Sequence, residues 1–146
     1  MLYCCKCHKW AYKTHKCDIM SLIPLTKEMR PVADRLYELG FEVMSASCFT
    51  YPEQQSIYEH RISLRVEFKN QYPIKTILGD LATGWKYYTQ IVGTDWPISI
   101  LGYCKVYVLT EYETVEERIK LIVAELAAYL DTRDKVALRS IMMLIG

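Results

Sequence analysis

Apolar and polar residues alternate most regularly in residues 61–69 of this chain. Ile62, Leu64, Val66 and Phe68 alternate there with charged residues and a serine, which is the pattern of a strand with one buried and one wet face. Shorter apolar runs predict further strands, while residues 49–57, with Pro52 and two glutamines, predict a loop. The predicted strands are residues 19–23, 41–48, 61–69 and 98–109, with an extra edge strand at residues 87–92.

Elsewhere the apolar residues recur at helical spacing, between residues that begin and end helices. Thr26 is placed to cap a first helix and Gly40 to end it, with Pro31 shifting its start or kinking it. Thr114, with Glu117 three residues later, forms a capping box ahead of a strongly amphipathic segment. The predicted helices are residues 26–39, 73–83, 114–130 and 134–145.

This order of elements is typical of an α+β fold. Strand, helix, strand, strand, helix, strand is the split βαβ, or ferredoxin-like, pattern, which gives an antiparallel sheet with helices on one face. The helix of residues 134–145 is an extra C-terminal element. Its apolar tail either packs back on the domain or forms a homodimer contact.

The first seventeen residues hold most of the chain's metal-binding chemistry, with four of the six cysteines and two of the three histidines. Cys4-x-x-Cys7 has the spacing that aims two thiolates at one ion, and His15-x-Cys17 is a second, compact pair. Together they match the tetrahedral sulfur and nitrogen sites of structural Zn²⁺. We therefore predict a zinc knuckle in residues 1–18 and an α+β domain in residues 19–146. The predicted ligands are Cys4, Cys7, His15 and Cys17, with Cys5 and His8 as alternatives in an overlapping frame.

Two other interpretations of this segment remain open. One is a free, redox-active tail with an adventitious metal site, and the other is a catalytic zinc site. Residues 1–17 contain no Asp or Glu to act beside a zinc-bound water, which disfavours catalysis. In a reducing compartment, clustered cysteines indicate metal binding more than disulfides.

The charge of the chain is balanced overall and uneven locally. The 146 residues carry a net charge of +1, so nothing indicates a general polyanion-binding protein. The knuckle is basic, and it presents a small cationic surface to phosphate or to an acidic protein unless its lysines only keep it soluble. These lysines are Lys6, Lys9, Lys13 and Lys16.

Aromatic residues supply further candidate contact surfaces. Twelve tyrosines favour half-exposed faces and interfaces. Trp85, Tyr87, Tyr88 and Trp96 surround a predicted connection and form either a satellite core or a partner-binding surface. A platform for single-stranded nucleic acid is a further interpretation, although the RNP signature of RRM domains is absent. It would combine Arg61, Arg65 and Lys69 with Tyr103, Lys105 and Tyr107.

Common catalytic motifs are missing from the sequence, which contains no P-loop, GxGxxG, GxSxG or HExxH pattern. Cys48 and His60 would be the nucleophile and base of a cysteine-dependent enzyme, which we rank below a non-enzymatic role. A small-molecule sensor is a third class that the fold allows. No segment has the apolar run of a signal peptide or a membrane span, so we expect a cytoplasmic protein without membrane contact.

The first third of the chain resembles small uncharacterised proteins of phages and Firmicutes. The shared features are a Cys/His knuckle, the Ile23-Pro24-Leu25 lead into a helix, and the stretch Gly40-Phe41 to Ser47-Cys48, after which Thr50-Tyr51 replaces that family's Gly-His. The resemblance implies a phage accessory protein in the host cytoplasm. We expect a non-enzymatic, zinc-stabilised recognition module that inhibits or modulates a host or defence protein. A protein partner is favoured over nucleic acid because the net charge is near neutral.

Overall fold

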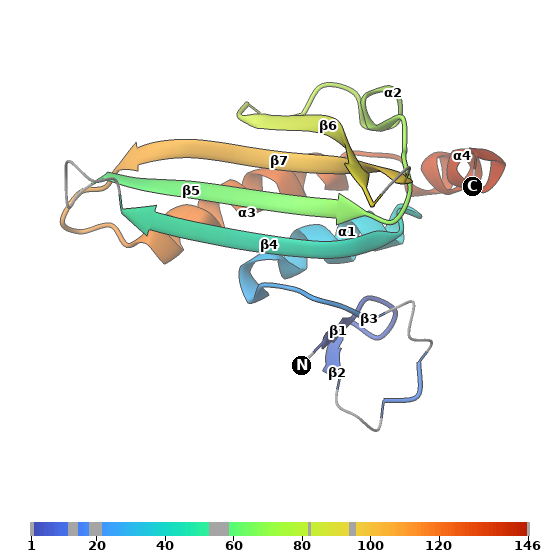
Figure 1. Ribbon diagram of the computed structural model, residues 1–146, viewed down its shortest axis with the longest axis horizontal. Coiled ribbons are helices and arrows are strands. Elements are labelled where there is room, and N and C mark those ends of the chain that lie inside the picture. Colours follow the sequence, from blue (N-terminus) through green and yellow to red (C-terminus); the bar gives the residue numbers. More distant parts are fainter. Residues whose placement is uncertain are drawn as a thin grey trace.

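The fold is α+β, with two antiparallel sheets and four α-helices in the part of the chain that the structure describes (Figure 1). The computed structural model describes residues 2–11, 15–17, 22–52, 59–81, 83–93 and 96–145. The larger sheet has the order β4 (Val43–Pro52), β5 (Glu59–Phe68), β7 (Trp96–Val108) and β6 (Trp85–Val92). The helices are α1 (Arg30–Glu38), preceded by the 3₁₀ turn η2 (Lys27–Met29), α2 (Ile74–Leu78), α3 (Val115–Asp131) and α4 (Lys135–Ile145).

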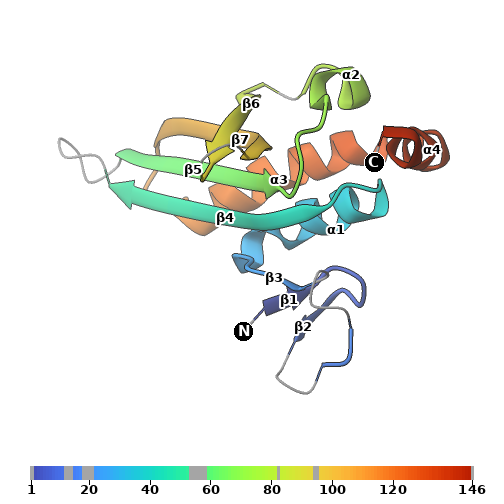
Figure 2. The same cartoon turned by 45° about the vertical axis from the view of Figure 1, so that its right-hand side comes forward.

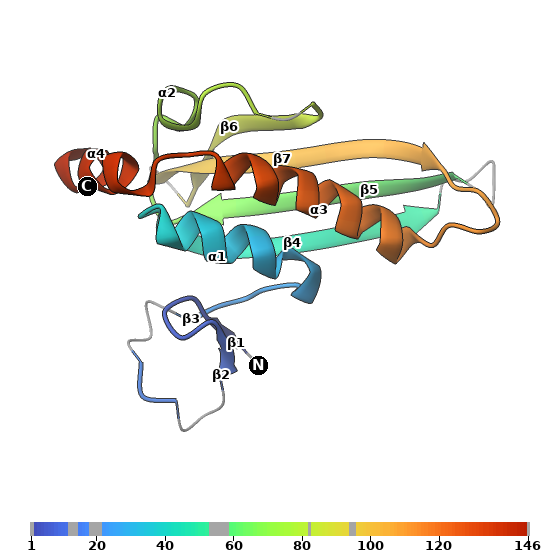
Figure 3. The same ribbon diagram turned by 180° about the vertical axis from the view of Figure 1, so that it is seen from behind.

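Helices α1 and α3 lie side by side on one face of the four-stranded sheet (Figure 3). The alternating residues of β5 point toward them, since Ile62, Leu64, Val66 and Phe68 are all buried, as the sequence pattern predicts. The predicted cap of α3 is confirmed, because the backbone N–H of Glu117 donates to Thr114 Oγ1 at 3.1 Å. The opposite face of the sheet carries no helix among the described residues (Figure 1).

A small three-stranded sheet lies beside α1 and the edge of β4 (Figure 2). Its order is β2 (Lys9–Ala11), β1 (Leu2–Cys4), β3 (Leu22–Ile23). Tyr3, Cys5 and Ile23 are buried in the same hydrophobic cluster as the residues of α1. The small sheet therefore spans the predicted boundary at residue 18 and shares its core with the rest of the chain.

The split βαβ arrangement is not confirmed. That pattern requires the strand before α1 to enter the same sheet as β4, with another strand between the two. Here β3 pairs with β1, and β5 pairs directly with β7. Leu25 makes a single parallel bridge to Ala46, so the chain entering α1 runs along the free edge of β4 with no strand between them.

Three local predictions differ from the structure. Residues 49–52 belong to β4 rather than to a loop, because Pro52 lies in a terminal position of an edge strand, where its missing N–H breaks no ladder. The predicted helix of residues 73–83 is only Ile74–Leu78, since Gly79 follows it with φ of 76°. Thr26 does not cap its helix; its Oγ1 accepts a hydrogen bond from the N–H of Cys48 at 3.2 Å.

Candidate metal centre and open sheet face

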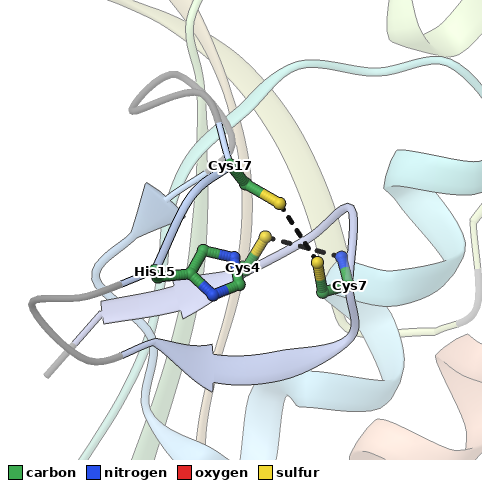
Figure 4. A group of neighbouring side chains, drawn as sticks. All are labelled: Cys4, Cys7, His15 and Cys17. Atoms are coloured by element: carbon green, nitrogen blue, oxygen red, sulfur yellow. Dashed lines mark hydrogen bonds between the residues drawn. The ribbon is translucent and has the colours of Figure 1, made fainter.

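Four side chains of the N-terminal segment converge on one point. The ligand atoms of Cys4, Cys7, His15 and Cys17 all lie within 4.8 Å of one another (Figure 4). Tetrahedral zinc with bonds of about 2.0–2.3 Å separates its ligands by roughly 3.3–3.8 Å, so small side-chain rotations suffice to bind an ion. Cys7 Sγ and Cys17 Sγ are 3.1 Å apart as free thiols. This is the predicted ligand set, and it can hold a metal ion.

The turn between β1 and β2 explains how two of these residues meet. The N–H of His8 bonds the carbonyl of Cys4 at 2.8 Å, and His8 takes a positive φ of 57° to close the turn. The N–H of Cys7 then points at Cys4 Sγ, at 3.4 Å (Figure 4). An amide that points at a sulfur favours a thiolate there, as a metal site requires.

Two properties of the group fit a bound cation. His15 Nε2 is buried and has no hydrogen-bond partner among the described residues, so a metal would satisfy an otherwise unpaired nitrogen. Burial alone would raise the pKa of the Cys4 thiol, but the hydrogen bond from the Cys7 N–H and the proximity of the His15 ring lower this pKa to about 7. The hydrogen bond to the Cys7 thiol raises the pKa of Cys17 to about 11. A divalent cation would deprotonate such thiols outright.

The alternative ligands, Cys5 and His8, lie outside this group. Cys5 points into the hydrophobic core and is 2% exposed, and burial raises the pKa of its thiol to about 11. His8 Nδ1 lies 2.8 Å from Asp34 Oδ1 on α1. Cys4 and Cys5 are consecutive, so one of the two faces the metal group and the other faces the core.

A polar network joins the metal segment to α1. The buried Tyr3 hydroxyl donates to Asp34, and Arg30 Nη2 donates to the carbonyl of His8 at 2.7 Å. Tyr3 also packs edge-on against Trp10, with ring centroids 5.3 Å apart. Because these groups come from both sides of the contact, the position of the segment against α1 is set by specific hydrogen bonds as well as by burial.

The predicted basic surface of the segment is only partly described. Lys6, Lys9 and Lys16 are exposed, while Lys13 lies outside the described residues. The structure shows no feature that concentrates these lysines into a pocket among the described residues.

The uncovered side of the four-stranded sheet is the second candidate site, which we call the open face. Residues paired directly across antiparallel strands share a face. Tyr51, Arg61 and Val106 are paired across three strands in this way, and Phe49, Ser63 and Cys104 form the next row. By this register the open face consists of Ser45, Ser47, Phe49, Tyr51, Glu59, Arg61, Ser63, Arg65, Glu67, Lys86, Tyr88, Gln90, Trp96, Ile98, Ile100, Gly102, Cys104, Val106 and Val108. Ile98 and Ile100 are buried on it.

Phe49 and Tyr51 were missed by the sequence pattern, which predicts a loop at these positions. The sequence signal that could have identified them is the period-two spacing of Ser45 and Ser47, which continues to Phe49 and Tyr51. A bulge between Val43 and Ser45 obscures it, because it shifts the inward phase of β4 from odd to even residues.

The aromatic residues predicted to bind a partner do not form one surface. Trp85 is 7% exposed and packs against Tyr103, so it is a core residue and not a contact residue. Tyr87 is half-buried against the core, whereas Tyr88 and Trp96 are exposed. Trp85 and Trp96 sit at opposite ends of the β6–β7 hairpin, about 23 Å apart along β6.

The predicted nucleic-acid platform also needs correction. Tyr103 and Lys105 pair with Leu64 and Ile62, so they lie on the helical side of the sheet and not beside Arg61. Tyr103 is buried there. By the same register, Phe49, Tyr51, Tyr88 and Trp96 are the aromatic residues that share a face with Arg61.

Cys48 and His60 do not form a catalytic dyad. Cys48 pairs with Leu64 and His60 pairs with Pro52, so the two lie four register positions, or about 13 Å, apart along the sheet. Burial raises the pKa of the Cys48 thiol to about 11, which disfavours a reactive thiolate.

Comparison with known proteins identifies no relative: no protein-family model, curated protein or solved structure matches this chain. Among the described residues, no helix has the length and apolar character needed to cross a membrane.

Proposed function

We propose that this chain is a non-enzymatic recognition module that binds a protein partner through its open face, with a zinc ion stabilising its N-terminal segment. The observation that carries the proposal is the uncovered group of apolar side chains on that face. Phe49 is 60% exposed, Tyr51 50% and Val108 70%. Phe49 and Tyr51 are same-face neighbours on β4, and Val106 and Val108 lie across from them on β7, with Arg61 and Glu59 of β5 in between. Isolated apolar side chains are ordinary on a surface, but several gathered on one face are typical of a binding site.

The composition of the open face fits a protein partner. Aromatic residues and arginine are the usual anchors of protein interfaces, and Arg61 lies between Tyr51 and Val106 in a single row. Three cations, Arg61, Arg65 and Lys86, share the face with the carboxylates Glu59 and Glu67. This slight positive excess favours a partner whose surface combines apolar and acidic groups.

Single-stranded nucleic acid is the second candidate. Phe49 and Tyr51 offer exposed rings on which bases can stack, and Arg61 can contact phosphate beside them. The net charge of +1 and the two carboxylates of the face favour protein over nucleic acid.

The proposed zinc ion would be held by Cys4, Cys7, His15 and Cys17. Three sulfurs and one nitrogen are a donor set of structural zinc, and they leave no position open for a substrate. The ion would order a segment that has little core of its own, and it would keep Tyr3 and Trp10 docked on α1.

Several finer expectations stay predictions. They are a phage origin, a host or defence protein as the partner, a cytoplasmic location and the alternative of a small-molecule sensor. A homodimer through α4 also stays a prediction, although Met143 and Leu144 are exposed there.

A photo-crosslinking amino acid at Tyr51 tests the partner, with the same group at Leu121 as the control. Leu121 is similarly exposed but lies on α3, on the other side of the molecule. We expect a protein that crosslinks at position 51 and not at position 121 in extracts of the cells that contain the chain. Once purified, that protein should bind Phe49→Ser at least about tenfold more weakly than the unaltered chain.

The same experiment can overturn the proposal. Crosslinking of nucleic acid at position 51 would establish the second candidate function instead. Crosslinks between two copies of the chain would indicate a homodimer. Equal crosslinking at the two positions would show that the open face has no specific partner.

A further inference from the structure

The open face contains a hollow of about 220 Å³ on its β6 side. Gly102 forms its floor in the middle of β7, and the cross-strand neighbours of Gly102 are Arg65 on β5 and Lys86 on β6. Ser63, Cys104 and Tyr88 are among the other lining residues. We call this hollow the Gly102 pocket.

Two glycines among the lining residues let tyrosine rings lie close against the backbone. A Cβ atom at Gly102 would lie 3.2 Å from Cε1 of Tyr88 and would reduce the space between the two cations. Gly84 has φ of 94°, and a Cβ there would lie 2.5 Å from the ring of Tyr103. The row Arg65–Gly102–Lys86 therefore has no central side chain of its own, and the Tyr88 ring lies over Gly102 as one wall of the pocket.

The polar groups around the pocket favour an anion. Each guanidinium nitrogen of Arg65 donates one hydrogen bond: Nε to Glu67 at 2.8 Å, Nη1 to the Tyr88 hydroxyl at 3.5 Å and Nη2 to Gln90 Oε1. The guanidinium is therefore already oriented, and each terminal nitrogen keeps a second N–H for a ligand. Glu67 is not a lining residue, and no carboxylate lines the pocket. Lys86 is exposed and has no ion-pair partner among the described residues. Ser63 adds a hydroxyl donor.

We propose that the Gly102 pocket receives the carboxylate of an acidic side chain from the protein partner. This inference rests on the proposed function, since it names the group that the partner presents to the open face. A carboxylate between Arg65 and Lys86 would be hydrogen-bonded by both cations and by Ser63, while its methylene groups would pack against Tyr88. The apolar group at Phe49 begins in the adjoining Ser63–Cys104 row, so the partner's acidic group would lie close to its apolar contacts.

The inference can be tested without the partner. N-acetyl-glutamate amide is titrated into the isotope-labelled full chain, and amide shifts are followed by NMR, with N-acetyl-glutamine amide as the neutral isostere. We expect saturable shifts at Arg65, Gly102 and Cys104 with the glutamate probe and none with the glutamine probe. Lys86→Gln should weaken binding about fivefold, the effect of one exposed ion pair.

Lys105→Gln is the matched control, because Lys105, on β7, is also an exposed lysine of this sheet but faces the helical side. Equal affinities of the Lys86 and Lys105 variants would overturn the inference, as would shifts spread over all surface lysines. If a phosphoserine probe bound at least about tenfold more tightly than the glutamate probe, the pocket would be assigned to a phosphoryl group and not to a carboxylate.

The outcomes for the pocket and for the proposed function are separate. If glutamate does not bind but the partner still depends on Phe49, the recognition function stands and only the pocket assignment fails. If glutamate binds at Gly102 but no protein crosslinks at Tyr51, the pocket stands as a small-anion site and the protein-binding function fails.

Discussion

Replacing Cys17 by serine should release the N-terminal segment and leave the four-stranded sheet folded. Cys17 is one of the four predicted ligands and is not part of the hydrophobic cluster. Its replacement therefore removes a metal ligand and little packing. A serine hydroxyl is a poor zinc ligand because it stays protonated. Metal content should therefore fall from about one ion per chain to nearly none.

The size of the effect follows from what the segment buries. Tyr3 is fully buried, and an aromatic side chain of this kind removes about 150–250 Å² from water. At about 25 cal/mol per Å² this is worth about 4–6 kcal/mol, an upper bound because unfolded chains already bury some surface. Ordering the backbone of the segment costs about 1–2 kcal/mol per residue, which over more than ten residues exceeds this gain, so the segment should undock without the ion. Binding of structural zinc, worth about 10–16 kcal/mol, offsets that cost.

Cys5→Ser is the matched control in the adjacent position. Cys5 is buried and lies outside the ligand group, so this variant should keep its metal and lose about 1–3 kcal/mol by burying a hydroxyl. Metal per chain is measured on protein purified without added metal, and amide hydrogen exchange reports each segment. In Cys17→Ser, β1 and β2 should lose protection while β5 and β7 keep it.

Two results would refute this reasoning. If Cys17→Ser kept a full complement of metal, or Cys5→Ser lost it, the ligand set would be wrong. If protection of β1 survived the loss of metal, burial of Tyr3 and its hydrogen bond to Asp34 would be sufficient to dock the segment.

Three further predictions test the packing. Gly84→Ala should lower the free energy of unfolding by roughly 2–5 kcal/mol, because it combines a left-handed φ with a clash against a tyrosine ring. Gly93→Ala, also at positive φ but with nothing within 4 Å, should lose only about 1–2 kcal/mol in the same urea titration, and equal losses would contradict the clash. The pKa of Cys48 is raised by burial to about 11, so the native state retains this proton longer than the unfolded chain does. Stability should fall as the pH rises from about 9 to about 11, and a Cys48→Ala variant that shows the same slope would exclude this cause. Asp34→Ala should lower the stability by about 1–3 kcal/mol in thermal unfolding, because the buried Tyr3 hydroxyl loses its acceptor; unchanged stability would show that water replaces it.

Short-range sequence patterns were sufficient to predict much of the structure of this protein. The period-two alternation of Ile62 to Phe68 identified β5 and its inward face, since backbone geometry fixes that alternation regardless of the partner strand. Thr114 marked the start of α3 because a cap acts within one helical turn. The Cys-x-x-Cys and His-x-Cys spacings selected the four side chains that converge, although two equally spaced alternatives stayed open.

Which face a side chain occupies depends on residues distant in the sequence, so only the tertiary structure decided it. Cys4 and Cys5 differ only in which one faces the core, and contact with α1 makes that choice. The bulge in β4 and its pairing with β5 placed Phe49 and Tyr51 on the open face, while pairing of β5 with β7 turned Tyr103 inward. Strand register is set by side chains far apart in the sequence, and a one-residue shift reverses every face, so the local pattern could not assign these residues to a surface. For the same reason the row that joins Arg65, Gly102 and Lys86 exists only in the assembled sheet.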